Sequence, residues 1–312
     1  MVQLEIGVQS TNEKTIHAIN RNMDVEKLEQ IVCSVKEGNN VHQHLDLIAG
    51  LPFEDYESFG HSFDRVYKME PEQLQLGFLK VLKGSQMYER AEEFGITYMC
   101  KPPYEVFYTK WLSYEDVLRL KRIEEMVEIY YNSNQFGHTL TFLLRVFGRP
   151  FVMYEALADF YEREGYFVNS PARSYRYQVL LKFAEEYDGK NAEVYKELLT
   201  YDMYLRENLK SRPAFATDVS DARIKDLIRS FYQREAEERK FLTDYASYDW
   251  KQLSKMTHLE PFRYPVWDIE HLKGRQRKKK ANSFVLFDYK ARNPLNHEAT
   301  THVINIFCED VE

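Results

Sequence analysis

Residues 41–52 read VHQHLDLIAGLP, a run of alternating character that closes on the turn-forming Gly50-Leu51-Pro52. Successive side chains of a β-strand point to opposite faces of a sheet. The apolar side chains at 45, 47 and 49 therefore share one face, while His42, His44 and Asp46 share the other. The stretch predicts a strand that is buried on one side and polar on the other.

Two more strand patterns lie on either side of this one, over residues 4–9 and 74–81, and amphipathic helical patterns cover 25–37 and 56–68. The helix over 25–37 is predicted to begin after Asp24, a good N-cap residue. Strands that alternate with helices at this spacing predict a parallel sheet covered by helices, either doubly wound or part of a β/α barrel. Three such units are present.

After Pro102-Pro103 the pattern becomes almost wholly helical, and the last fifty residues return to strand. A hairpin is expected from strands over 283–289 and 301–308, joined by the turn at 292–296. We therefore expect an α/β domain over 1–110 and a mainly helical domain over 111–312 that ends in a β-hairpin. The helices are expected over 115–132, 140–147, 153–164, 172–187, 194–210 and 222–243.

Composition narrows the class of protein. Of the 312 residues, 44% are apolar and only 12 are Gly and 10 Pro, which excludes a disordered or collagen-like chain. The net charge of −7 argues against a surface that coats nucleic acid. No apolar run of membrane-spanning length and no signal-peptide pattern are visible, so we expect a cytoplasmic protein. The basic run Arg275–Lys280 is interpreted as a solvated loop, with nucleic acid or anionic lipid as the alternative ligand.

The strand patterns also predict a binding surface. Alternation places Gln9, Asp46 and Gln75 on the polar side of three adjacent strands, beside Gly77, which has no side chain. Ligands of parallel α/β sheets bind at the carboxyl ends of the strands, where Asp46 lies. We expect these residues to form a concave, hydrogen-bonding wall with room beside it.

Two other chemistries compete for the same segments. His42 and His44 with Asp46 suggest a zinc hydrolase, although at 3.3 Å per residue His42 lies about 13 Å from Asp46, too far for a shared ion. Ser10 lacks the G-x-S-x-G pattern of an activated nucleophile and is interpreted as a hydroxyl at a helix start. We therefore assign no catalytic and no metal-binding residue.

Several motifs together resemble the second half of the radical S-adenosylmethionine (SAM) barrel. The resemblance is to the barrel of oxygen-independent coproporphyrinogen oxidases and, more closely, to the barrel of cobalamin-binding radical SAM proteins. It rests on the segments 5–10, 19–21, 44–52 and 74–84. The segment 102–106 and the helical tail, with Thr200-Tyr201-Asp202 and Arg212-Pro213, resemble an uncharacterised C-terminal domain of the latter group. The resemblance implies a partial (half) radical-SAM-type β/α barrel with parallel strands over 1–110, containing the last three β/α units.

The same resemblance implies cofactor-binding roles for three residues. Gln9 would contact the sugar or amino-acid part of SAM, Arg21 its carboxylate, and Asp46 would accept a hydrogen bond from it. An arginine suits a carboxylate because its planar fork makes two charge-assisted hydrogen bonds.

The cysteines depart from the family pattern. Radical SAM enzymes hold a [4Fe–4S] cluster with a C-x-x-x-C-x-x-C loop, whereas the three cysteines here, Cys33, Cys100 and Cys308, are widely separated. Cys33 is expected on the apolar side of its helix. SAM, the [4Fe–4S] cluster and cobalamin would then belong to the full-length family.

From these departures we expect a C-terminal portion of a radical SAM oxidoreductase or methyltransferase-like enzyme, inactive alone, of unknown substrate. It would be a cloned fragment, a truncated reading frame or half of a split protein. The alternative is a non-catalytic module whose helical domain docks a partner. The first strand would be a sheet edge, which predicts a homodimer through that edge or cover by a missing N-terminal segment.

Overall fold

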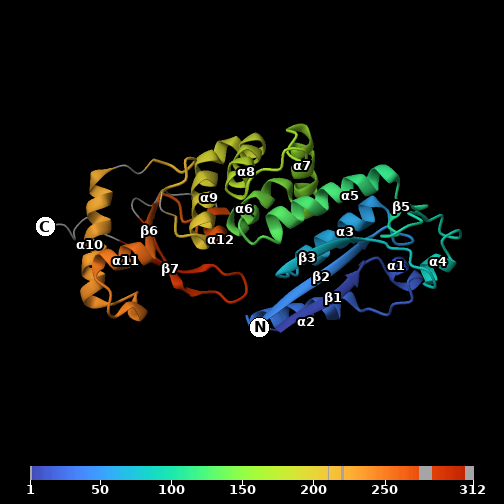
Figure 1. The fold of residues 1–312 in the computed structure, drawn as a ribbon, viewed down its shortest axis with the longest axis horizontal. Helices are drawn as coiled ribbons and strands as arrows, with labels where there is room; N and C mark the ends of the chain where they lie inside the picture. The colour runs from blue at the N-terminus through green and yellow to red at the C-terminus, as the bar shows by residue number, and fades with distance from the viewer. Residues whose placement is uncertain (1, 210, 219–220, 274–282, 306–312) are drawn as a thin grey trace. The chain divides into compact units, whose positions relative to one another are not determined.

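The computed structural model describes residues 2–209, 211–218, 221–273 and 283–305 (Figure 1). The chain forms two compact units. The first comprises Met1–Asn134 with Phe147–Ser170, and the second comprises Gln135–Val146 with Pro171–Glu312. The domain boundary near residue 110 stays a prediction from the sequence.

A parallel sheet organises the first unit. Its strands are β1 (Val2–Gln9), β2 (Val41–Ala49) and β3 (Gln73–Phe78), in the order β1-β2-β3, and they lie side by side in Figure 1. Both strand pairs are parallel, with Gly7 opposite Asp46 and Asp46 opposite Gln75. The expected mixed α/β class with a parallel sheet is confirmed.

Helices cover the apolar face of this sheet. The unit contains α1 (Glu13–Ala18), α2 (Val25–Glu37) and α3 (Tyr56–Tyr67), and the last two both contact β2. Leu45 and Leu47 are fully buried beneath them, and the Gln43 amide donates to the Val32 carbonyl of α2 at 3.0 Å. The Asp24 side chain caps α2 as predicted, because it accepts from a first-turn N–H at 3.0 Å.

One edge of the sheet is closed by a side chain. α5 (Tyr114–Met126) continues into a π-helical turn, η1 (Val127–Tyr131), so the predicted helix over 115–132 is two elements. The Asn132 amide then accepts from the Leu74 N–H and donates to the Leu74 carbonyl, both at 3.0 Å. These are the bonds that a neighbouring strand would otherwise make at that residue.

α7 (Pro150–Arg163) packs closely on α3. A Cβ at Gly60 would lie 2.7 Å from the Phe151 ring, so the two helices meet where α3 has no side chain. The third strand is shorter than the predicted 74–81, because beyond Phe78 the chain turns to pair Lys80 with Glu105. The unit also holds α4 (Gln86–Glu89), β4 (Thr97–Tyr98) and β5 (Val106–Tyr108).

The second unit combines helices with an antiparallel sheet. β7 (Ser283–Arg292) and β8 (Ala299–Asn305) form the predicted hairpin, and β6 (Thr257–Phe262) pairs with the other edge of β7. Sequence analysis missed β6 because Pro261 interrupts its strand pattern. Its helices are α6 (Gly137–Phe147), α8 (Arg173–Asp188), η2 (Gly189–Asn191), α9 (Ala192–Arg206), α10 (Ala222–Glu238), η3 (Thr243–Tyr245), α11 (Trp250–Met256) and α12 (Ile269–Lys273).

Two predicted helices of this region are shorter in the structure. The helices predicted to reach residues 210 and 243 end earlier, at Arg206 and Glu238. The basic run Arg275–Lys280 lies outside the described residues. In the part of the chain that the structure describes, no helix is both long and apolar enough to cross a membrane.

Candidate functional site

The side of the sheet away from α2 and α3 is polar and open. We call it the polar face; by strand register its members are Gln3, Glu5, Gly7, His42, His44, Asp46, Ile48, Gln73, Gln75 and Gly77. Three buried side-chain atoms on this face, His42 Nδ1, His44 Nε2 and Asp46 Oδ1, have no hydrogen-bond partner among the described residues. Buried polar atoms are almost always bonded, so the hydrogen-bonding capacity of this face is not used up within the described residues.

Asp46 lies at the centre of the polar face. Its Oδ1 is 3.1 Å from His44 Nε2, close enough for an ion pair but not aligned as a hydrogen bond. Burial raises the pKa of Asp46, the neighbouring His44 lowers it, and Glu5 on the adjacent strand raises it; the net direction is upward. A ligand group that donates a hydrogen bond to Asp46 would offset that desolvation.

The carboxyl end of β1 is distorted at Gln9. The pairing with β2 shifts between Gly7 and Gln9, and Gln9 has a φ of 69°, in the left-handed region. The Ser10 N–H donates to the Val8 carbonyl at 2.9 Å, which closes a three-residue turn around Gln9. A bulky residue adopts this backbone only where surrounding contacts hold it.

Gly7 is the point at which Gln9 and Arg21 meet. A Cβ at Gly7 would overlap the Gln9 amide nitrogen and lie 3.4 Å from an Arg21 guanidinium nitrogen. Arg21 Nη1 also donates to the Gly7 carbonyl. Since Gly7 is opposite Asp46 in the sheet, the structure brings Gln9, Arg21 and Asp46 to one place. Their role in binding SAM stays a prediction.

A buried carboxyl group next to this place was missed by the sequence analysis. Glu54 follows β2 and is 1% exposed. Its Oε1 accepts from Ser10 Oγ at 2.6 Å and from Ser62 Oγ at 3.0 Å, while its Oε2 has no partner among the described residues. Burial raises the pKa of Glu54 to about 7, although the two hydroxyl bonds lower it. Only the tertiary fold buries this residue, because the segment Phe53-Glu54-Asp55 has no sequence pattern typical of a core.

Ser10 has the structural role expected from the sequence. Its hydroxyl accepts from the N–H of Asn12 at 3.0 Å, and the Asn12 side chain caps α1. Ser10 therefore links the helix start to Glu54 and anchors the chain directly after Gln9. The loops that follow β1 and β2 are thus joined at the carboxyl edge of the sheet.

The described cysteines do not fit an iron–sulfur cluster. Cys33 is exposed on α2, so the prediction that it lies on the apolar side of that helix was wrong; Val32 takes the buried position instead. Cys100 is exposed after β4, and Cys308 lies outside the described residues. Within the described ranges, no three His, Cys, Asp or Glu side chains are arranged to hold a metal ion.

Among the described residues of the second unit, His138 pairs with Asp202 and His258 pairs with Glu260, and the first pair lies at the start of α6. Asp202 accepts from the backbone N–H groups of His138 and Thr139, at 3.1 and 2.9 Å, and from the Thr139 hydroxyl at 2.7 Å. It also lies 2.9 Å from His138 Nδ1. Burial lowers the pKa of His138, but the bond to Asp202 and the charges of Asp202 and Glu298 outweigh it, so the pKa is raised. Asp202 thus caps the start of α6 and holds the pair in place.

Comparison with known proteins places the chain in a family. Residues 92–287, more than half of the chain, match the family described as protein of unknown function (DUF4080). The chain belongs to the DUF4080 family. The three strands of the parallel sheet precede the segment that this DUF4080 match covers.

Relatives of this DUF4080 protein carry more specific descriptions. It is 32% identical over 96 residues to the oxygen-independent coproporphyrinogen-III oxidase-like protein HemZ of Bacillus subtilis (strain 168), a match that covers 30% of this chain and 19% of HemZ. The chain thus spans about a fifth of the curated relative. A solved structure that matches is coproporphyrinogen III oxidase (HemN) from Escherichia coli, described as a radical SAM enzyme. The match covers 26% of this chain and 18% of the HemN chain, at 30% sequence identity and a TM-score of 0.25.

Proposed function

We propose that the polar face binds S-adenosylmethionine as part of a radical SAM-type β/α structure. The observation that carries the proposal is the meeting of Gln9, Arg21 and Asp46 around Gly7, on a face with buried polar atoms that lack partners. The sequence relation to HemZ supports the same class of protein.

The donor set on this face fits the polar groups of SAM. Arg21 would donate to the SAM carboxylate, since one of its N–H groups already fixes the guanidinium on the Gly7 carbonyl. The Gln9 amide both donates and accepts, and Asp46 would accept from the ammonium or a ribose hydroxyl. Gly77 leaves room beside these groups because it has no side chain, whereas the space over Gly7 is taken by the Gln9 amide.

The [4Fe–4S] cluster is proposed to come from cysteines outside this sequence. When SAM is bound to such a cluster, it supplies radical chemistry. The contribution of this chain would be to bind and orient SAM, and we propose that it does not cleave SAM alone. Cobalamin, if the full-length protein uses it, would also be held by other segments.

Direct binding of SAM tests the proposal. We expect equilibrium dialysis to show saturable binding of SAM that Arg21→Gln weakens about tenfold, because a charge-assisted bond is lost. Arg90→Gln is the matched control, since Arg90 pairs with Glu93 on the surface. No saturable binding, or equal affinity in both variants, would contradict the proposal.

Anaerobic SAM cleavage with iron quantification separates enzyme from docking module. We expect no cleavage by this chain alone, and cleavage when a segment with C-x-x-x-C-x-x-C is supplied. Cleavage of SAM by this chain alone would contradict both the proposal that the chain needs an added cluster segment and the alternative of a non-catalytic docking module. The non-catalytic docking module remains the alternative if SAM binds neither alone nor with that segment.

A partner at the open edge of β1 is also proposed. Among the described strands β1 pairs only with β2, and Val2 and Leu4 on it are 58% and 40% exposed. An open strand edge with apolar residues associates readily with another strand. We propose that this edge is paired in the functional protein, by a second copy of the chain or by another segment.

A further inference from the structure

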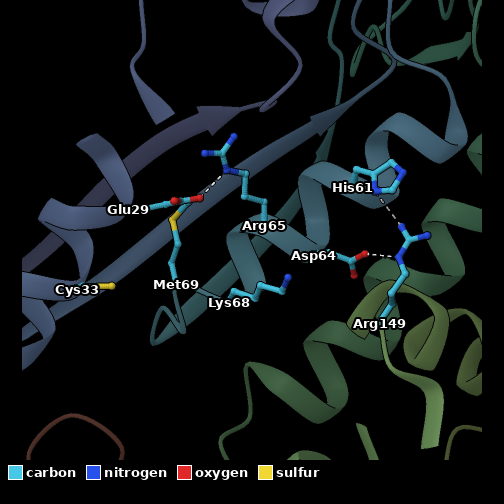
Figure 2. Close-up of a pocket in the computed structure, with 8 residues that line it drawn as sticks. All are labelled: Glu29, Cys33, His61, Asp64, Arg65, Lys68, Met69 and Arg149. Carbon is cyan, nitrogen blue, oxygen red and sulfur yellow. Dashed lines mark hydrogen bonds and ion pairs between the residues drawn. The ribbon is translucent and has the colours of Figure 1, made fainter. Parts of the chain in front are cut away.

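A cavity lies in the first unit among the helices that cover the apolar face of the sheet. Its volume is about 660 Å³, and Figure 2 shows the residues around it. Cavities of this size take small molecules. The lining residues come from α2, from one side and the end of α3, and from the residue before α7; they are Glu29, Cys33, His61, Asp64, Arg65, Lys68, Met69 and Arg149.

Positive charge is in excess in this cavity. Arg65, Lys68 and Arg149 face two carboxylates, in a chain whose net charge is −7. Each carboxylate forms an ion pair with one arginine. Arg65 Nε is 2.5 Å from the Glu29 carboxylate, and Arg149 Nε is 2.6 Å from the Asp64 carboxylate. Lys68 has no ion-pair partner among the described residues. Its charge is therefore available to a ligand.

The Arg149 side chain is held in place by the buried carboxylate of Asp64. Asp64 is 7% exposed, and its two oxygens accept from Arg149 Nε and from the Phe151 N–H at 2.8 Å, which caps α7. The terminal guanidinium nitrogens are left for other contacts, and one lies 3.4 Å from His61 Nδ1 (Figure 2). A guanidinium fixed in this way loses little side-chain entropy when it binds an oxyanion.

The cavity also has an apolar part. Met69 is 3% exposed and forms part of the lining, as does Cys33 of α2, which Figure 2 labels. We propose that this cavity binds a small organic phosphate monoester. Lys68 and Arg149 hold the phosphate, while Met69 and Cys33 contact the apolar body. The site is separate from the polar face, because α2 and α3 cover the opposite side of the sheet.

Calorimetric titration with phenyl phosphate and with inorganic phosphate tests the proposal. We expect saturable binding of both, with phenyl phosphate tighter, because its ring contacts Met69. Lys68→Gln should weaken phenyl phosphate about tenfold, and Lys68→Arg should retain it. Lys14→Gln removes an exposed lysine on α1 and should change nothing.

Alkylation of Cys33 shows where the ligand binds. Cys33 and Cys100 are both exposed, so iodoacetamide should modify both in the free protein. Phenyl phosphate should slow modification of Cys33 severalfold and leave Cys100 unchanged. The proposal is overturned if phenyl phosphate does not saturate, if Lys68→Gln binds it as the native chain does, or if Cys33 is not protected. Equal affinity for phenyl phosphate and inorganic phosphate would show that Met69 and Cys33 do not contact the apolar part of the ligand. SAM binding should be the same in Lys68→Gln, so failure here is distinguishable from failure of the SAM proposal.

Discussion

The two compact units differ in how they satisfy buried carboxylates. In the first, Asp46 Oδ1 and Glu54 Oε2 are buried without a hydrogen-bond partner, and both lie near the carboxyl ends of parallel strands. In the second, no buried carboxylate oxygen among the described residues lacks a partner. Its buried acids are Asp188, Glu197, Asp202, Glu235, Glu260 and Asp288. Complete hydrogen bonding is typical of a structural role, whereas the unpartnered Asp46 oxygen on the polar face supports the proposed SAM site.

Glu197 and Asp202 show the structural use of a buried acid. Glu197 Oε2 accepts from the N–H groups of Arg263 and Tyr264, at 2.9 and 3.0 Å, and so ties α9 to the segment after β6. Asp202, one turn further along α9, caps α6. The motif Thr200-Tyr201-Asp202, which carried part of the family resemblance, is explained by packing within the second unit.

The largest expected effect is on Asp202. Asp202→Ala leaves two backbone N–H groups and the His138 ring without their acceptor, so the free energy of unfolding should fall by about 3 to 5 kcal/mol. Urea denaturation measures this. Asp249→Ala removes an exposed N-cap on α11 and should cost about 1 kcal/mol. Equal effects of the two changes would show that Asp202 is not the structural anchor described here.

The second prediction concerns the protonation of Glu54. Because the pKa of Glu54 is raised to about 7, the native state holds a proton that the unfolded chain loses near pH 4.5. Stability should therefore fall as pH rises from about 4.5 to 7, with a contribution on the order of 3 kcal/mol. Glu54→Gln keeps the acceptor for Ser10 and cannot ionise.

Denaturation of the native chain and Glu54→Gln across this pH range checks the assignment. The pH slope should be smaller in the variant, though not zero, since burial also raises the pKa of Glu197 to about 7. Identical slopes would mean that Glu54 is ionised in the folded protein at all of these pH values.

The third prediction compares two glycines of the polar face. A Cβ at Gly7 would displace the Gln9 amide, whereas a Cβ at Gly77 meets only ordinary contacts, 3.5 Å from the Leu47 carbonyl oxygen. Gly7→Ala should weaken SAM binding about tenfold, as expected for loss of a positioned polar contact, with Gly77→Ala near native. Thermal unfolding of both variants should confirm folding. Equal SAM affinities of the two variants would show that Gln9 does not contact SAM.

The smallest expected effect concerns the two edges of the parallel sheet. Asn132 closes the β3 edge at Leu74, but no described residue pairs the outer edge of β1. Light scattering should show self-association that Leu4→Lys reduces, with stability changed by no more than about 0.5 kcal/mol. A monomer at all concentrations would leave another segment, rather than a second copy, as the partner of β1.

Local signals predicted much of the first unit. Helix α2 has the predicted ends because Asp24 caps it and Gly38 ends it, and both effects act within one turn. Strand β2 has the predicted ends because alternation over 41–49 and the turn at Gly50 are local too. The strand over 257–262 was not predicted, since Pro261 disfavours a strand and only pairing with β7 stabilises it.

The sequence by itself determined which side of the parallel sheet is polar, because side chains alternate along a strand whatever surrounds it. It also placed Asp46 on that side, whereas Gln9 lies beyond a register shift and its amide reaches Gly7 through a left-handed backbone. The tertiary structure alone decided the left-handed backbone at Gln9, the burial of Glu54 and the exposure of Cys33. The burial of Glu54 depends on residues distant in the chain, because Ser10 bonds to it across 44 positions, and contacts of that kind leave no period in the sequence.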